Sequence, residues 1–371
     1  MKPIFLIALI LVLAAHIPAE EALPLSVSPQ VRLAQLQQEY KAAVAAEDWA
    51  KADAALEGFL KIEPRHTAMI YNRVCVLCRI PEKTKALNLL SKLSREGFDD
   101  VTQVEADKDL DAIRKDKRFK AILVRIKKNF KKGYEKGKPM PGIKTLEGAP
   151  AGGLPYRLRM DPAATKEKPH HLIIWLHPTG ASMNGPIEEQ APFFIKRGFA
   201  LCVFPKKDFR AWTSNDAIRL FNTLNHLKSV AGIDKTRRPV FFGYSAGGQL
   251  TLRIWTMNPN AIGGMILLGT WPTLMGPDRK PMAVLPREDK TLKHPPIYIL
   301  IGAKEQGSGY WQRVAPEYEK RGASLTIRII EGKGHVWLMT TPELKRIGQW
   351  MDEHFSDQPA AGVDKEAESE K

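Results

Sequence analysis

Apolar residues recur at three- and four-residue spacing over the first third of the chain, from about Val31 to Lys132. Such apolar stripes predict amphipathic helices, each burying one face against neighbouring helices. Pro64 and Pro81 interrupt the pattern, and each predicts a helix boundary because proline has no amide hydrogen to donate. The clearest stripes are formed by Leu33, Leu36, Tyr40, Ala43 and Val44, by Trp49, Ala52, Leu56, Phe59 and Leu60, and by Ala86, Leu89, Leu90 and Leu93.

The pattern changes after the stretches Pro139–Gly142 and Gly148–Gly153, which we interpret as a linker and domain entry. Short apolar runs then alternate with amphipathic segments, and this βαβ rhythm predicts an α/β fold with a mainly parallel sheet covered by helices on both faces. The expected strands are Leu172–Leu176, Ala200–Phe204, Val240–Phe242, Met265–Leu268, Ile297–Ile301 and Leu325–Ile330. The expected helices are Pro186–Arg197, Asn215–Val230, Gln249–Met257, Tyr310–Lys320 and Glu343–Phe355.

The two ends of the chain differ from its interior. Residues 1–19 combine a positive start, an apolar run and a small residue, Ala19, which is typical of a cleaved secretory signal peptide. The apolar run is shorter than the roughly 20 residues that cross a bilayer, so an uncleaved anchor is the less favoured alternative. We expect a periplasmic or secreted protein without a stable membrane span after cleavage. The charged residues 357–371 predict a disordered tail, and the two domains expected are 29–135 and 140–356.

Length, charge and cysteine usage narrow the function classes. A chain of 371 residues favours about two domains. The net charge of +15 is concentrated between Arg114 and Lys138, but no nucleic-acid-binding motif accompanies it. We therefore favour a solvated helix face over an anionic partner, and expect no nucleic acid. Cys75 and Cys78 lie in an apolar helical stretch without a preceding strand, which favours packing in a helix core over a redox or zinc site.

The segment Gly243-Tyr244-Ser245-Ala246-Gly247-Gly248 follows an expected strand and precedes an expected helix. A nucleophilic serine on so tight a turn needs small neighbours, and the glycines at positions 243 and 247 supply them, which gives the G-x-S-x-G pattern of a nucleophile elbow. The helix N-terminus that follows favours developing negative charge. We predict that Ser245 is a catalytic nucleophile.

An acid and a histidine follow in the order and at the places that this chemistry needs. Glu305 comes just after the fifth expected strand, and His335 comes just after the sixth. Because the carboxyl ends of parallel strands meet at one edge of a sheet, both side chains should lie near Ser245. His335 is the predicted base and Glu305 is the predicted orienting acid. Asp278 is the alternative acid.

Residues from about 153 to 355 resemble a secreted α/β-hydrolase of the esterase, polyhydroxybutyrate-depolymerase and dienelactone-hydrolase group. The resemblance rests on the elbow, on Gly302–Glu305, on Gly332–His335 and on the sequence Leu176-His177-Pro178-Thr179-Gly180. In this group an aspartate stands more often than a glutamate at the position of the acid, so Glu305 is a departure from the common pattern.

The resemblance implies an oxyanion hole built from backbone amides. Relatives usually have glycine where this chain has Pro178, and proline cannot donate a hydrogen bond to an oxyanion. The implied donors are therefore the amide of Ala246 and the amide of Thr179 or Gly180. Trp271 and Trp337 are expected on loops at the same edge, where they would form an aromatic wall for a substrate. The alternative is that they fill core or interdomain space.

The helical region resembles tetratricopeptide repeats. Ala43–Pro64 is similar to the second part of one repeat, and Thr67–Gly97 is similar to the next. Such repeats usually bind protein partners through a concave surface. Two repeats with a cap serve equally well as a structural unit that packs against a second domain, so both roles stay open.

Together these features predict an exported serine hydrolase that cleaves carboxylic ester bonds through a Ser–His–Glu triad and an acyl-enzyme intermediate. The expected substrates are small-molecule or polymer esters, and no metal or organic cofactor is expected. A serine peptidase is one alternative, since the same acyl chemistry cleaves amides. The other is a binding protein in which the helical repeats bind a partner beside an inactive hydrolase domain.

Overall fold

The computed structural model describes residues 29–206, 212–275, 281–289 and 293–355. The predicted signal peptide and tail lie outside these residues. The chain divides into two compact units, one ending at Pro64 and one beginning at Arg65. The domain bounds expected from the sequence stay predictions.

The first unit contains two helices, α1 (Pro29–Ala45) and α2 (Trp49–Ile62). They pack as a hairpin in which Leu36 lies against Gly58, where a Cβ atom would come within 3.0 Å of the leucine side chain. The turn between them ends at Asp48, whose carboxylate accepts a hydrogen bond from the amide of Lys51 at 3.1 Å. This contact is a helix N-cap, and it satisfies an amide that has no partner inside the helix.

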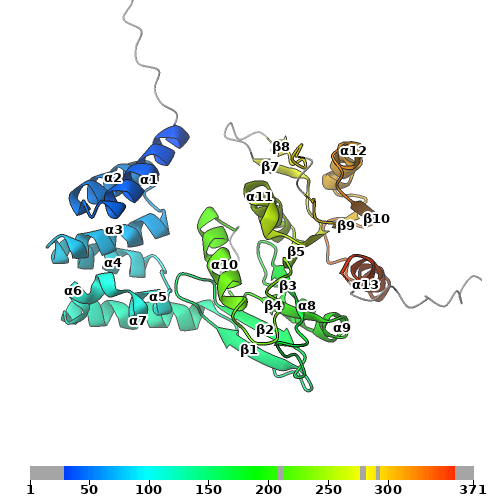
Figure 1. Cartoon of the computed structure of the whole chain (residues 1–371), viewed down its shortest axis with the longest axis horizontal. Helices are drawn as coiled ribbons and strands as arrows, with labels where there is room; N and C mark the ends of the chain where they lie inside the picture. Colours follow the sequence, from blue (N-terminus) through cyan, green and yellow to red (C-terminus); the bar gives the residue numbers. More distant parts are fainter. Residues whose placement is uncertain (1–28, 207–211, 276–280, 290–292, 356–371) are drawn as a thin grey trace, which may run out of the picture. The chain divides into compact units, whose positions relative to one another are not determined.

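The second unit begins with a helical segment (cyan and blue-green in Figure 1) and confirms the helical region expected before the sheet. Cys75 and Cys78 are buried thiols in its first helix. Its last helix buries Phe119, Ile122 and Ile126 and carries many of the exposed basic residues. The resemblance to tetratricopeptide repeats stays a prediction. The helices are α3 (Thr67–Arg79), α4 (Lys83–Arg95), α5 (Val101–Ala106), η1 (Lys108–Leu110), α6 (Asp111–Arg114) and α7 (Lys117–Gly133).

An eight-stranded sheet follows, with the strand order β1-β2-β4-β3-β5-β6-β9-β10. Strand β2 is antiparallel to β1 and to β4, and the neighbours from β4 to β10 are all parallel. The mainly parallel sheet is therefore confirmed. The strands are β1 (Lys144–Gly148), β2 (Tyr156–Met160), β3 (His171–Leu176), β4 (Phe199–Val203), β5 (Val240–Tyr244), β6 (Gly264–Leu268), β9 (Ile297–Gly302) and β10 (Leu325–Ile330), with a separate pair β7 (Thr273–Met275) and β8 (Pro281–Ala283).

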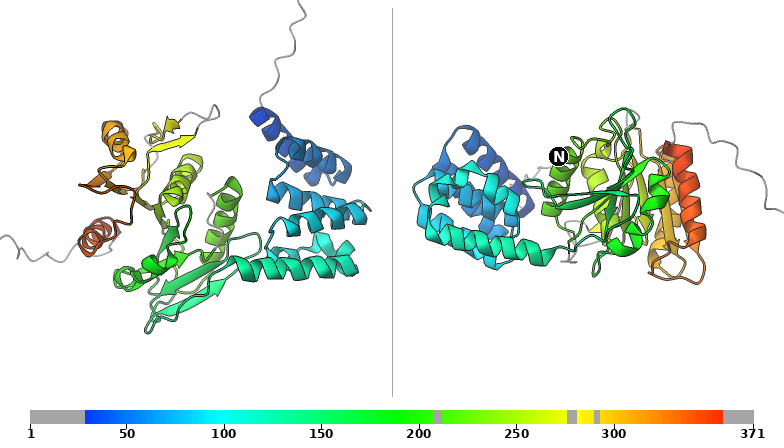
Figure 2. Two further views of the ribbon diagram at one scale, coloured as in Figure 1. Left: turned by 180° about the vertical axis from the view of Figure 1, so that it is seen from behind. Right: turned by 90° about the horizontal axis from the view of Figure 1, so that it is seen from below.

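Helices cover both faces of this sheet, as Figure 2 shows. Successive residues of a strand point to opposite faces, so Phe241 joins one core cluster and Phe242 joins the other. Helices α10 (Ser214–Leu227), α11 (Ala246–Met257) and α12 (Gln306–Lys320) pack on the Phe241 face. Helices α8 (Asn184–Glu188), α9 (Ala191–Ile195) and α13 (Thr341–Phe355) pack on the Phe242 face, and η2 (Pro259–Ala261) follows α11.

Two expectations about the elements need correction. The single helix expected over Pro186–Arg197 is two short helices, because Pro192 has no amide hydrogen to continue the first helix and lies instead in the first turn of a second helix that begins at Ala191. The sequence analysis also missed β1 and β2, which form the antiparallel end of the sheet.

Among the described residues, no helix combines the length and apolar character that crossing a bilayer requires.

Candidate active site

Strand β5 runs directly into Ser245, and helix α11 begins at the next residue. Ser245 has φ +51° and ψ −112°, a conformation that costs free energy for a non-glycine residue and is kept only where the surroundings enforce it. Two backbone hydrogen bonds do so here. The Ser245 amide donates to the carbonyl of Leu268 at 2.9 Å, and the Ser245 carbonyl accepts from the amide of Gln249 at 3.0 Å.

The two elbow glycines are needed because other backbone segments pass very close to them. A Cβ atom on Gly243 would lie 2.5 Å from the amide nitrogen of Gly248. A Cβ atom on Gly247 would lie 1.9 Å from the carbonyl oxygen of Leu176, at the end of β3. The sharp turn of the elbow therefore packs against the start of the loop that follows β3.

The structure brings Ser245, His335 and Glu305 together in one chain of hydrogen bonds. The Ser245 hydroxyl lies 3.0 Å from Nε2 of His335, and Nδ1 of His335 lies 2.6 Å from Oε2 of Glu305. The second carboxylate oxygen of Glu305 accepts a hydrogen bond from the Gly302 amide at 3.0 Å. Glu305 itself is 7% exposed.

The carboxylate of Glu305 fixes the protonation pattern of the imidazole. The hydrogen bond to Glu305 raises the pKa of His335, while partial burial of the ring acts in the opposite direction. Because Nδ1–H donates to the carboxylate, the lone pair of Nε2 faces the serine hydroxyl. The ring is thereby held in the tautomer that can accept the hydroxyl proton.

Gly269 makes room for the imidazole and was missed in the sequence analysis. It has φ +50°, and a Cβ atom there would lie 3.1 Å from ring atoms of both His335 and Tyr244. The available signal was a glycine directly after a buried strand, β6, at the same edge as the elbow. Close approach of two side chains is a common reason for glycine at such a position.

The predicted oxyanion donors lie on two segments that meet at the elbow. Ala246 is the first residue of α11, where backbone amides have no acceptor inside the helix. Thr179 and Gly180 are exposed residues of the loop after β3, and Gly180 has φ +92°. This loop is held at its start by Trp212, whose indole N–H donates to the carbonyl of His177 at 2.8 Å.

The two tryptophans expected to contact substrate, Trp271 and Trp337, have different surroundings. Trp271 is 38% exposed and packs over Gly307, where a Cβ atom would lie 2.1 Å from the indole. Trp337 is half-buried and lies edge-on to Trp175, with ring centroids 5.8 Å apart. Trp271 therefore has an indole surface accessible to a ligand, whereas Trp337 packs against Trp175 and Tyr244 of the core. The alternative acid, Asp278, lies outside the described residues.

Among the described residues, one group brings together side chains of the types that bind metals. Ligand atoms of Cys75, Asp107 and Asp109 lie within 4.8 Å of one another. Both carboxylates already have hydrogen-bond partners, because Tyr71 donates to Asp107 at 3.0 Å and Arg79 binds Asp109. Burial also raises the pKa of the Cys75 thiol, which disfavours the thiolate that metals prefer. We interpret the group as a hydrogen-bonded cluster of the helical segment.

The strand order, the antiparallel β2 and the serine elbow after β5 define an α/β-hydrolase fold.

No known family model matches the chain, and no curated protein matches it. Solved structures similar to it include esterase 2 of Thermogutta terrifontis, with 15% identity over 58% of this chain and 96% of that chain and a TM-score of 0.45. Fluorophosphonate-binding serine hydrolase F of Staphylococcus aureus has 13% identity, covers 56% and 97%, and has a TM-score of 0.44. S-formylglutathione hydrolase of the same organism has 14% identity, covers 56% and 98%, and has a TM-score of 0.43.

Proposed function

We propose that the protein is a serine hydrolase that cleaves carboxylic ester bonds, with Ser245 as nucleophile, His335 as base and Glu305 as orienting acid. The observation that carries the proposal is the continuous hydrogen-bond chain from the serine hydroxyl through the imidazole to a buried carboxylate, with contacts of 3.0 Å and 2.6 Å. This geometry lets the imidazole remove the hydroxyl proton as the oxygen attacks a carbonyl carbon.

The reaction would proceed in two halves. Attack by Ser245 Oγ gives a tetrahedral intermediate, whose oxyanion is stabilised by the Ala246 amide and by the amide of Thr179 or Gly180. The protonated His335 then gives its proton to the departing alcohol as the ester bond breaks, which leaves an acyl-enzyme. Water, deprotonated by the same imidazole, attacks the acyl group and releases the acid. Glu305 stabilises the imidazolium in both halves.

The proposal extends to location and substrate. Residues 1–19 support export to a periplasm or beyond the cell. The accessible indole of Trp271 supports a substrate with a flat group, such as a sugar or phenol, that can stack on an aromatic ring.

Replacing Ser245 with alanine tests the central claim. Ser245→Ala should abolish both hydrolysis of p-nitrophenyl acetate and covalent labelling by a fluorophosphonate probe, because both reactions need the serine oxygen. Ser229→Ala, at an exposed serine after α10, is the matched control and should leave both unchanged. A wild-type protein that reacts with neither reagent, nor with longer acyl or feruloyl esters, would refute the proposal.

A further inference from the structure

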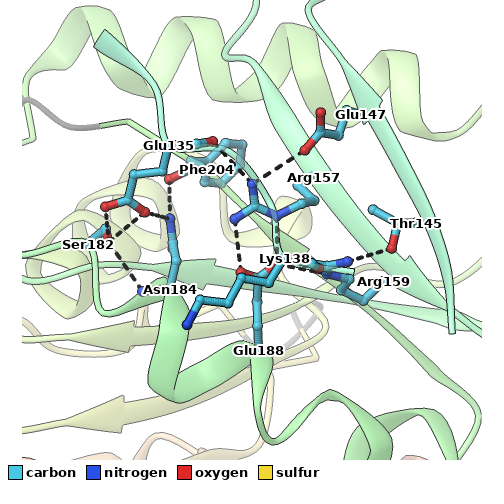
Figure 3. Close-up of polar contacts among 10 residues, drawn as sticks. All are labelled: Glu135, Lys138, Thr145, Glu147, Arg157, Arg159, Ser182, Asn184, Glu188 and Phe204. Carbon is cyan, nitrogen blue, oxygen red and sulfur yellow. Dashed lines mark hydrogen bonds and ion pairs between the residues drawn. The ribbon is translucent and has the colours of Figure 1, made fainter. Parts of the chain in front are cut away.

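The segment after α7 is hydrogen-bonded to the loop after β3 through Glu135, as Figure 3 shows. The Ser182 hydroxyl lies 3.0 and 3.1 Å from the two carboxylate oxygens of Glu135. The Asn184 side-chain amide donates to the same carboxylate at 3.3 Å and to the carbonyl of Phe204 at 3.1 Å. The Glu135 carboxylate therefore joins a segment before the sheet to Ser182 and Asn184, and Asn184 extends the link to the residue after β4.

The loop that Glu135 holds is the loop that carries the predicted oxyanion donors. Its start packs against the elbow at Leu176, and Thr179 and Gly180 follow within four residues. Its end contains Met183, a non-glycine residue with φ +50°. This left-handed conformation costs free energy and needs surroundings that enforce it. The residues on either side of Met183 are Ser182 and Asn184, the two partners of Glu135.

Glu135 is itself fixed in place. Its amide donates to the carbonyl of Pro205 at 2.7 Å, and its carbonyl accepts from Nη1 of Arg157 at 3.3 Å. The Arg157 guanidinium binds Glu188 with two parallel hydrogen bonds, of 2.7 and 2.9 Å. Arg157 is 1% exposed, so this anchor is deep inside the domain. A preorganised carboxylate of this kind can hold a loop without losing much freedom of its own.

We propose that Glu135 is a positioning residue for the hydrolase reaction, holding the loop after β3 so that the amide of Thr179 or Gly180 faces the oxyanion. This inference rests on the proposed function. Glu135 acts through Ser182 and Asn184, and it does not touch the reacting atoms. Its effect is therefore expected in the transition state, where the oxyanion develops, and not in binding of the ground-state ester.

Steady-state kinetics with p-nitrophenyl acetate test the positioning role. Glu135→Ala should lower kcat by about 10- to 100-fold, because misplacing a catalytic group by about 1 Å can cost about 100-fold, and KM should change less than about threefold. Glu135→Gln should recover part of the loss, because its amide oxygen still accepts from the Ser182 hydroxyl. Glu147→Ala is the matched control, since Glu147 contacts the same Arg157 guanidinium at 3.4 Å but makes no contact with the loop in Figure 3. The control should keep the wild-type kcat.

Amide hydrogen exchange gives a readout that needs no activity. In Glu135→Ala, the peptide covering residues 179–184 should exchange faster than in the wild type, while peptides of β5 and α11 stay protected. Unchanged exchange in this peptide, or a wild-type kcat in Glu135→Ala, would overturn the inference and leave the proposed esterase function intact. If the wild type hydrolyses no ester, the proposed function fails, and faster loop exchange would still support the role of Glu135 in holding the loop.

Discussion

Two regions of the α/β part of the chain each bury a glutamate, and the partners of these two glutamates differ. At the carboxyl edge of the sheet, the side chain of Glu305 is 3% exposed, and its ionisable partner is His335, which is 48% exposed. Beside β2, the side chain of Glu188 is 10% exposed and binds Arg157 and Arg159, which are 2% and 1% exposed. An arginine stays charged throughout the ordinary pH range, whereas a histidine gains and loses its proton near neutrality.

The comparison separates a structural ion cluster from a site suited to chemistry. Glu188 accepts hydrogen bonds of 2.7, 2.9 and 2.8 Å from two guanidiniums, which balance its negative charge. Glu305 is held by one backbone amide and faces a group that can change its charge beside the Ser245 hydroxyl. A buried carboxylate is thus informative about function only together with the pKa and the exposure of its partner.

The largest effect should come from removing the charge of Glu305. Glu305→Gln should lower kcat for p-nitrophenyl acetate by about 10³- to 10⁴-fold, because the neutral amide no longer fixes the imidazole tautomer or stabilises the imidazolium. The overall fold should be kept, as shown by an unchanged circular dichroism spectrum. Asp278→Asn is the matched control and should keep kcat within about twofold of the wild type, since Nδ1 of His335 has one hydrogen and already donates it to Glu305. A large loss in Asp278→Asn with an active Glu305→Gln would reverse the assignment of the acid.

Removing Glu188 should act on stability instead of chemistry. Glu188→Ala should lower the free energy of unfolding by about 3–5 kcal/mol, because it leaves the buried guanidiniums of Arg157 and Arg159 without their shared carboxylate. The change would be measured by guanidinium chloride denaturation. Glu147→Ala removes a glutamate that is 59% exposed from the same arginine, and we expect a change below about 1 kcal/mol. Equal losses in the two variants would contradict the distinction drawn between buried and exposed partners.

Sequence patterns predicted the residues at the carboxyl edge of the sheet better than the residues beside β2, for a physical reason. Five of the six parallel strands are apolar runs buried on both faces, and the edge strand β10 is partly buried. Ser245, Glu305 and His335 follow the carboxyl ends of β5, β9 and β10 by one, three and five residues. Parallel strands all end at the same edge, so the order of the runs along the chain was enough to predict that these three residues meet.

Strand β2 could not be predicted in this way. Its sequence, Tyr156-Arg157-Leu158-Arg159-Met160, alternates apolar and charged residues, a pattern typical of a strand with one solvent-exposed face. All five residues are buried, because Glu188 comes from a helix later in the chain and neutralises both arginines. Glu135 was missed for the same reason, since its partners Ser182 and Asn184 lie more than 40 residues away in the chain. Pairings of this kind leave no local pattern.

Changing the pH by one unit should give the smallest effect of these experiments. It should also distinguish most directly the site around Glu305 from the ion cluster around Glu188. The hydrogen bond to Glu305 raises the pKa of His335. A protonated imidazole cannot accept the proton of Ser245, so kcat/KM should fall as the pH drops through this raised pKa, approaching a tenfold loss per pH unit well below it. The pH–rate profile of the wild type should therefore have its acid limb centred above about 6.5, the ordinary pKa of histidine.

The raised pKa of His335 makes stability depend on pH in the opposite direction to activity. Because the folded protein holds the imidazole proton more tightly than the unfolded chain does, the stabilisation from this pair is complete below about pH 6.5 and is lost as the pH rises through the raised pKa. Arginine side chains in general stay protonated over that range, so replacing Glu188 should leave this slope unchanged. Following the His335 ring protons by NMR should show its pKa falling in Glu305→Gln and staying raised in Glu188→Gln. An equal pKa of His335 in both variants would mean that the charge of Glu305 does not control the imidazole in solution, and the contrast between the two buried glutamates would then have no chemical basis.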